Sequence, residues 1–418
     1  MKKIIFMIHT YSNSGIERRV TNLSNEFVKN NYSVEIVVVQ GITNSPFYYL
    51  HPDVKLVSVN EKKCRVNYVD RSIISEKPPQ PRVQSERTTK KTNTKKKVDI
   101  KKKTYKQRLK SQWKKSKLIH YLSAVWYWRT YRKYFKDAKP DIVIPFGLNF
   151  LERVLASTKG INCKIFDSEM VAHERALFYK RPVLEYYYSL LKKVNGIIVQ
   201  THTEKDFFKK NFDNVSVINN PINPQLPAPY YGTRNKTIVN FCRLAPQKNI
   251  ELLLDAFAKL HIDYPDYIVQ IYGNIVNRDE KEYKRKLQMR IYDANLQDYF
   301  FILPPTSDIH QRVIESAMFV MSSDFEGISN SMLEAMAIGL PCVCTDCLGG
   351  GTREVMEDHE NGLIVPMNDS EAMYKAMREY IENPDLAERC SKNAAKIREK
   401  LSVERISKQW IDVIDCGE

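Results

Sequence analysis

The stretch DFEGISNSMLEAMAIGLP, Asp324–Pro341, places two glutamates eight residues apart, Glu326 on an expected loop and Glu334 one turn into an expected helix. Small polar residues and a glycine lie between them, which suits a turn from loop to helix. Ser331 and Glu334 match the capping box Ser-x-x-Glu, in which the glutamate accepts a hydrogen bond from the N-cap amide. This pattern gives Glu334 a structural role but does not explain Glu326. A role for Glu326 has to be sought in the rest of the chain.

The apolar pattern on both sides of this stretch predicts alternating strands and helices. Amphipathic segments such as GIERRVTNLSNEFVKN separate short apolar runs, and this alternation is typical of a parallel, doubly wound sheet. The first series of expected strands is KIIFMIH, SVEIVVVQ, VKLVSVN, DIVIPFG, KIFDSE, GIIVQT and VSVINN. The second series is TIVNFCRL, YIVQIYGN, YFFILP, AMFVMSS, PCVCTD and GLIVP. The predicted fold class is therefore α/β, with two Rossmann-like, doubly wound parallel-sheet domains facing across a cleft.

The length and the prolines indicate how the chain is divided. A chain of 418 residues exceeds one ordinary core, and the proline-rich stretch NNPINPQLPAP separates the two strand series. We expect an N-terminal domain at 1–220, a linker at 221–230 and a C-terminal domain at 231–400. The N-terminal domain would contain a basic insertion at about 72–117. Residues 401–418 would form a last helix that returns towards the N-terminal domain.

The net charge of +16 is concentrated in one segment, because residues 76–117 hold 17 Lys and Arg against 3 acidic residues. Lysine-rich runs bind nucleic acid, bind anionic membrane surfaces or remain solvated. No base-reading motif accompanies the charge. The aromatic and basic segment KLIHYLSAVWYWRTYRKYF follows it. We expect this segment to be a helix packed on the sheet and the basic residues before it to contact an anionic membrane, with no nucleic acid as a partner.

Composition also bears on compartment and metal. No run of 18 apolar residues occurs, and the apolar start Ile4–Ile8 is too short for a signal peptide, so we expect a cytoplasmic protein that is peripheral on the inner face of the membrane. The three cysteines of PCVCTDCL have no second Cys or His cluster at ligand spacing. They are expected to be buried free thiols rather than metal ligands.

Two expected strand ends carry groups that suit an anionic ligand. Gly15 lies where the first strand gives way to a helix, and backbone amides at such a turn can bind an anion, although a tight turn would also need a glycine. In FCRLAPQKNIELLLDAF, Arg243 follows a strand and Lys248 precedes a helix for which Asn249 is a plausible N-cap. Two cations at a helix N-terminus can clamp a diphosphate.

Taken together, these motifs resemble the retaining glycosyltransferases of the GT-B fold, family 4 type. The hallmark of that family is Glu-x7-Glu followed by Ala-Met-Ala-x-Gly-x-Pro, and here Glu326 and Glu334 have that spacing before AMAIGLP. The segments SGIER, RL with QKN, GGGTRE and NGLIVP also match. The resemblance spans most of the chain apart from residues 61–117.

The resemblance implies a role for each residue of the Asp324–Pro341 stretch. Glu334 would accept hydrogen bonds from the ribose of a nucleotide sugar, and Glu326 from hydroxyls of the transferred sugar. A carboxylate suits both tasks because it only accepts hydrogen bonds. The backbone amides that would donate to the sugar or the phosphate are those of Gly327, Ile328 and Ser329.

The resemblance also implies how the leaving group is stabilised. Arg243 and Lys248 would stabilise the leaving diphosphate in place of a metal ion, and the sequence contains no Asp-x-Asp. No metal and no other cofactor is therefore expected. Gly15 would contribute to donor binding from the N-terminal domain.

One residue of the family pattern stays open. Relatives often place a histidine near the sugar on a loop after an N-terminal-domain strand, and FDSEMVAHERALF offers His173 there. Some relatives have Ser-Glu-Arg-Asn at this point, which Ser168 and Glu169 could match instead.

The activity expected from the resemblance is metal-independent, retaining transfer of a hexose or N-acetylhexosamine. The donor would be a nucleoside-diphosphate sugar, bound by the C-terminal domain. The acceptor would be a glycan, expected to be lipid-linked, in surface polysaccharide biosynthesis such as lipopolysaccharide or capsule. The alternative is a catalytically silent GT-B subunit that binds or assembles at the membrane, because a fold alone does not establish activity.

Overall fold

The computed structural model describes residues 1–9, 11, 15–39, 49–60, 65–69, 128–168 and 181–415. His173, Glu169 and the basic insertion expected at 72–117 lie outside the described residues. The predictions made for them are not tested by the structure.

The first domain is built on an eight-stranded sheet with the strand order β4-β3-β2-β1-β5-β6-β7-β8. Its strands are β1 (Lys3–Ile8), β2 (Ser33–Val38), β3 (Lys55–Asn60), β4 (Arg65–Tyr68), β5 (Ile142–Pro145), β6 (Lys164–Ser168), β7 (Gly196–Val199) and β8 (Val215–Val217). All pairs are parallel except β3 with β4, which is antiparallel. The prediction of a fully parallel sheet is therefore wrong at one edge of this domain. There the four-residue strand β4 runs antiparallel to β3.

The second domain is built on a six-stranded sheet with the order β11-β10-β9-β12-β13-β14. Its strands are β9 (Thr237–Arg243), β10 (Ile268–Asn274), β11 (Phe300–Leu303), β12 (Met318–Met321), β13 (Cys342–Thr345) and β14 (Leu363–Val365). Every pair in this sheet is parallel, as the alternation of strands and helices predicts.

Helices cover both faces of each sheet, because the strands are apolar on both sides. In the first domain they are α1 (Gly15–Lys29), α3 (Leu148–Thr158), α5 (Arg181–Leu191) and α6 (His202–Lys209). In the second they are η3 (Pro246–Lys248), α7 (Ile250–Asp263), α8 (Arg278–Asp293), α9 (Ile309–Val313), α10 (Asn330–Ala337), α11 (Gly351–Val355), α12 (Ser370–Glu382) and α13 (Pro384–Ala395). Residues 128–138 are also helical. Tyr131, Tyr134 and Phe135 of that helix join the core cluster on one face of the first sheet, so the described part of the predicted aromatic helix does pack on the sheet.

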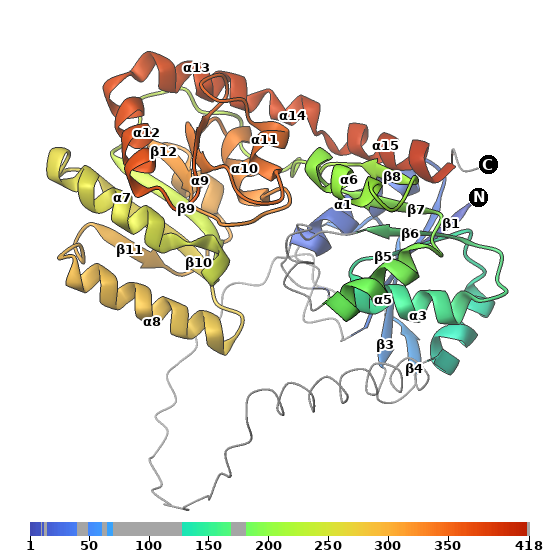
Figure 1. The fold of residues 1–418 in the computed structure, drawn as a ribbon. Helices are drawn as coiled ribbons and strands as arrows, with labels where there is room; N and C mark the ends of the chain where they lie inside the picture. Colours follow the sequence, from blue (N-terminus) through green and yellow to red (C-terminus); the bar gives the residue numbers. More distant parts are fainter. Residues whose placement is uncertain are drawn as a thin grey trace, which may run out of the picture.

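The end of the chain crosses from the second domain to the first. Helices α13, α14 (Ile397–Lys400) and α15 (Val403–Asp415) run in succession along the top of Figure 1, and α15 lies over the N-terminal domain. Trp410 of α15 is fully buried. The hydroxyl of Tyr32 donates a hydrogen bond to Asp415, with 2.6 Å between the oxygens. The last helix thus packs against α1 and the turn between α1 and β2.

The two sheets bring their carboxyl edges together. In each sheet the strand order reverses beside the first strand, between β1 and β5 and between β9 and β12. Ligands of doubly wound sheets bind outside the carboxyl ends of the strands at such a reversal. The helix that follows β1 is α1, and the helix that follows β12 is α10, so their N-termini mark the two reversal points.

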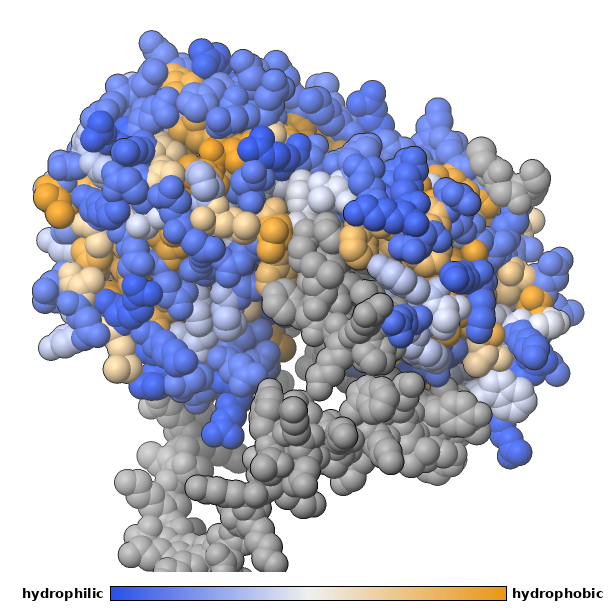
Figure 2. Space-filling view, in the orientation of Figure 1, coloured by the Kyte–Doolittle hydropathy of each residue, from blue (hydrophilic) through white to orange (hydrophobic). Residues whose placement is uncertain are grey.

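The described surface is mostly hydrophilic on the face drawn in Figure 2, with apolar residues in small groups. None of the described helices combines the length and the apolarity that crossing a bilayer requires.

Candidate functional site

The turn after β9 positions a lysine against a glutamate. Strand β9 ends at Arg243, and the 3-10 turn η3 ends at Lys248. Asn249 has the left-handed backbone conformation (φ 42°) that asparagine tolerates, and its side chain accepts a hydrogen bond from the amide of Leu252. Asn249 therefore caps α7 as predicted, and the sharp turn fixes the lysine before it.

Lys248 and Glu326 form a close and nearly buried ion pair. The lysine Nζ lies 2.5 Å from Oε1 of Glu326, and the two side chains are only 12% and 13% exposed. Burial alone would lower the pKa of Lys248, but the Glu326 carboxylate outweighs it and holds that pKa above its ordinary value. The ammonium of Lys248 is thus held in its charged form beside Glu326, where β9 and β12 end.

Arg243 lies beside this pair with a different partner. Its Nε is 3.4 Å from Oε1 of the buried Glu280, and its side chain remains 46% exposed. Its positive charge also acts on Lys248, opposing the protonated form of the lysine. The structure therefore brings Arg243, Lys248 and Glu326 together at one edge of the second sheet.

Backbone contacts on both sides hold the loop that carries Glu326. The amide of Asp324 donates to the carbonyl of Gln247 at 2.9 Å, and the amide of Glu326 donates to the carbonyl of Leu348 at 2.9 Å. The carbonyl of Gly327 occupies the place where Gly351 would carry a Cβ, so the loop packs directly on the first residue of α11. Glu326 is therefore on a loop, as predicted, and that loop is anchored between two others.

The capping-box prediction for Glu334 is wrong. Helix α10 begins at Asn330, and its N-cap is Ser329, whose side chain accepts from the amide of Met332. Ser331 therefore lies inside the helix, and Glu334 is too far along it to bond back to the cap.

Glu334 instead contacts two basic side chains from other elements. One carboxylate oxygen pairs with Arg18 of α1, and the other lies 2.8 Å from Nε2 of His310 in α9. Burial alone would raise the pKa of Glu334, but Arg18 and His310 outweigh it and hold that pKa below its ordinary value. Sequence reasoning missed both partners, although Arg18 belongs to the SGIER motif and His310 follows a strand at the same sheet edge.

Gly15 lies where the two domains touch. A Cβ at this position would overlap the side-chain amide of Asn330, the first residue of α10. The N-termini of α1 and α10 are therefore directly apposed, and Gly15 lies where the carboxyl edges of the two sheets meet.

The amides predicted to bind the donor are not all available in this arrangement. The amide of Ile328 donates to Oε1 of Gln200 at 2.8 Å, across the domain boundary. Thr201, the next residue, donates its hydroxyl to the carbonyl of Gly349 at 2.8 Å. The chain after β7 thus binds the loops on both sides of Glu326, which differs from the expected free amide at Ile328.

The cysteines of the second domain are free thiols. Cys342, Cys344 and Cys347 are buried and unpaired, as predicted. Burial raises the pKa of Cys347 to about 11. Within the described residues, no three His, Cys, Asp or Glu side chains are grouped so as to hold a metal ion.

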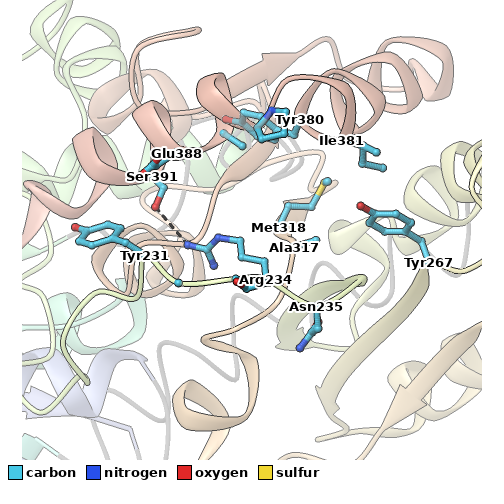
Figure 3. Close-up of a pocket in the computed structure, with 14 residues that line it drawn as sticks. Tyr231, Arg234, Asn235, Tyr267, Ala317, Met318, Tyr380, Ile381, Glu388 and Ser391 are labelled. Carbon is cyan, nitrogen blue, oxygen red and sulfur yellow. Dashed lines mark hydrogen bonds between the residues drawn. The ribbon is translucent and has the colours of Figure 1, made fainter.

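A cavity lies away from this edge, at the opposite end of the second sheet. It has a volume of about 540 Å³ and is lined by residues just before β9, β10 and β12, among them Asn235, Tyr267 and Ala317. Figure 3 shows Arg234 between Tyr231 and Tyr267. The Arg234 guanidinium donates to the backbone carbonyls of residues 230, 314, 316 and 339. The cavity is thus at the amino edge of the sheet, and its one arginine is already engaged.

Comparison with known proteins agrees with this geometry. Residues 231–397 match the family model described as glycosyl transferases group 1. An uncharacterized glycosyltransferase of Haemophilus influenzae is 28% identical over 54% of this chain and 63% of its own length. The poly(ribitol-phosphate) alpha-N-acetylglucosaminyltransferase of Staphylococcus aureus is 27% identical over 68% of this chain and 57% of its own length. The chain thus spans less than two thirds of each of these relatives.

One further relative matches a shorter part of the chain, and two solved structures share its fold. A Campylobacter jejuni enzyme named as an N-acetylgalactosaminyltransferase acting on a diphospho-undecaprenol-linked sugar is 31% identical over 40% of this chain and 43% of its own length. Sucrose-phosphate synthase of Thermosynechococcus elongatus superposes with a TM-score of 0.74 at 15% identity, over 100% of this chain and 99% of the other. HepE of Anabaena does so with a TM-score of 0.70 at 14% identity, over 100% of both chains. The predicted GT-B fold is therefore confirmed. The chain thus has the GT-B fold, and its residues 231–397 match glycosyl transferases group 1.

Proposed function

We propose that this protein transfers a hexose or N-acetylhexosamine from a nucleoside-diphosphate sugar to a lipid-linked glycan acceptor, with retention of configuration and without a metal ion. The observation that carries the proposal is the Lys248–Glu326 pair, buried at the carboxyl edge of the second sheet with Arg243 beside it. Lys248 can pair with the anionic diphosphate of a nucleotide sugar. The neighbouring Glu326 carboxylate can accept hydrogen bonds from the sugar hydroxyls.

Each residue of this edge has a defined task in the reaction. The bond between the anomeric carbon and the diphosphate oxygen breaks, and its electron pair leaves with the diphosphate. Lys248 and Arg243 stabilise that growing negative charge. Glu326 accepts hydrogen bonds from hydroxyls of the sugar, whose ring passes through an oxocarbenium-like transition state. The acceptor oxygen bonds to the anomeric carbon, and its proton passes to the departing diphosphate oxygen.

The remaining assignments follow the family resemblance. Glu334 binds the ribose, and the amides of Gly327 and Ser329 with the turn at Gly15 contact the phosphates or the sugar. The amide of Ile328 joins them once it is released from Gln200. His173, or Glu169 in its place, contacts the sugar from the N-terminal domain.

The proposed pathway is surface polysaccharide biosynthesis. The Staphylococcus and Campylobacter relatives are named for transfer of amino sugars to a poly(ribitol-phosphate) and to an undecaprenol-linked glycan. HepE, which shares the fold, was crystallised with UDP. We place the protein in the cytoplasm at the inner face of the membrane, held there by the basic residues 76–117.

The test is a panel of nucleotide sugars, with release of nucleoside diphosphate measured in the presence and absence of EDTA. We expect one donor to be turned over at the same rate in both conditions. Glu326→Ala should abolish turnover while nucleoside diphosphate still binds. An absolute need for a divalent ion would contradict the metal-free chemistry. Unchanged turnover by the variant would refute the role of Glu326, and binding of a donor without any turnover would favour a silent subunit.

A further inference from the structure

Glu334 joins two domains through a cluster of three nearly buried side chains. Arg18 comes from α1 of the first domain, Glu334 from α10, and His310 from α9 of the second domain. Their side chains are 12%, 9% and 15% exposed. Because burying charged groups is costly unless they are paired, this arrangement is specific rather than a chance surface contact.

The two partners engage different oxygens of the carboxylate. An ionised carboxylate has two oxygens with about four acceptor positions, and it can only accept hydrogen bonds. Arg18 occupies a position on Oε1, and His310 donates to Oε2. Each oxygen thus retains a further acceptor position, and a pair of neighbouring hydroxyls needs two such positions.

Packing fixes each partner. The ring of His310 meets Phe241 of β9 edge to face, with 5.8 Å between the ring centroids. Arg18 lies three residues after Gly15 on α1, and Glu334 lies four residues after Asn330 on α10, so each pair shares one face of its helix. The helices therefore meet at two points, Gly15 with Asn330 and Arg18 with Glu334.

We propose that Arg18 and His310 are positioning residues for the ribose of the donor, holding one oxygen of Glu334 each and leaving the other acceptor positions for the ribose diol. Arg18 belongs to the opposite domain, so the ribose subsite is complete only when α1 is docked on α10. Donor binding and domain closure are then coupled through a single ion pair. This inference rests on the proposed function, because it takes the ligand to be a nucleotide sugar.

The experiment measures nucleoside-diphosphate and donor affinity in variants of the full-length chain. Arg18→Met keeps the length of the side chain and removes its charge, and Arg18→Lys restores a charge. His310→Phe keeps an aromatic ring against Phe241 and removes the N–H group that donates to Glu334. His310→Gln restores an N–H group. We expect Arg18→Met and His310→Phe to weaken binding about tenfold or more, the order expected for a lost hydrogen bond to a charged group. The Lys and Gln variants should recover part of that loss.

Two controls separate positioning from a structural role. Arg290→Met removes an exposed ion pair with Asp255 in the second domain and should leave binding unchanged. In a Glu334→Gln background, Arg18→Met should change affinity by less than about twofold. The effects of two substitutions on binding are not additive when one residue acts through the other. The effect on turnover should fall on KM rather than on kcat, since the groups touch no reacting atom.

Each other outcome is decisive. Unchanged affinity in Arg18→Met would overturn the positioning role, and tighter binding would show instead that Arg18 competes with the ribose. Equal losses in the wild-type and Glu334→Gln backgrounds would show that Arg18 acts elsewhere. If the wild-type protein bound no nucleotide sugar at all, the proposed function itself would fail, together with this inference.

Discussion

Nζ of Lys248 and Oε1 of Glu326 lie 2.5 Å apart, although the two residues come from different strand ends, 78 positions apart in the chain. The pair is almost inaccessible to solvent, so each charge is held by the other. In the proposed reaction Lys248 stabilises the diphosphate on one side of the bond that breaks. Glu326 binds the sugar on the other side.

Replacing Lys248 by methionine should lower kcat for donor turnover by about 10²–10³, the usual cost of removing one group that stabilises developing negative charge. The change also leaves the Glu326 carboxylate without its partner, so thermal stability should fall. The measurement is steady-state release of nucleoside diphosphate, combined with thermal unfolding. Lys259→Met is the matched control, because Lys259 pairs with Glu371 at 2.8 Å on the exposed surface. That variant should behave like the wild type, and a wild-type kcat in Lys248→Met would contradict the assignment.

Adding one methyl group at Gly15 should impair donor binding. The Cβ of Gly15→Ala would overlap the side-chain amide of Asn330, so that side chain must turn away and strain its hydrogen bond with Asn220, or α1 and α10 must separate. Overpacking of this size costs about 1–3 kcal/mol, which predicts a donor KM raised about tenfold. Asn330→Ala in the same chain removes the overlapping amide and should restore most of the affinity. A double variant no better than Gly15→Ala alone would show that the contact with Asn330 is not the cause.

The ionised state of Glu334 should be visible in the pH dependence of stability. Its pKa in the folded protein lies below the ordinary value of 4.5, so its ion pairs stabilise the fold fully above pH 4.5. That contribution is lost as the pH falls from 4.5 through the folded pKa. Thermal unfolding of the wild type and of Glu334→Gln between pH 7 and pH 3 should show a stability difference that narrows below pH 4.5. A constant difference would mean that Glu334 does not ionise with a lowered pKa.

The sequence predicted much of this fold because the strands are buried on both faces. Each apolar run that was expected to be a strand is one, and the edge that holds Arg243, Lys248 and Glu326 follows from where those strands end. Strand β4 was missed, since RVNY is short and lacks an apolar run, and its pairing depends on its place beside β3.

The partners of Glu334 could not be predicted in the same way. Ser329 and Ser331 are both competent N-caps, and the local pattern does not decide between them. Which one caps α10 depends on the loop clamped between Gln247 and Leu348. Arg18 is hundreds of residues away from Glu334 in the chain, and only the docking of the two domains brings them together.

The final prediction concerns the basic residues, whose role is independent of the catalytic edge. Residues 76–117 carry 17 Lys and Arg against 3 acidic residues, whereas the rest of the chain is close to neutral. Each lysine near an anionic leaflet contributes about 1 kcal/mol, so a chain lacking residues 76–104 should no longer bind acidic vesicles. A variant with glutamine in place of every Lys and Arg of 76–104 keeps the length of the segment and should fail in the same way.

Co-sedimentation with vesicles of anionic and of neutral lipid, each at two salt concentrations, provides the measurement. Binding of the intact protein should require anionic lipid and weaken steeply with salt, because exposed charges are screened beyond about 10 Å at 0.1 M. Turnover of a soluble donor should be nearly the same in all three proteins, while transfer to a membrane-embedded acceptor falls in the two variants. Equal vesicle binding by all three proteins would show that the basic residues do not hold the protein at the membrane. Loss of soluble-donor turnover in the deletion variant alone would indicate that the segment has a role in folding rather than in lipid contact.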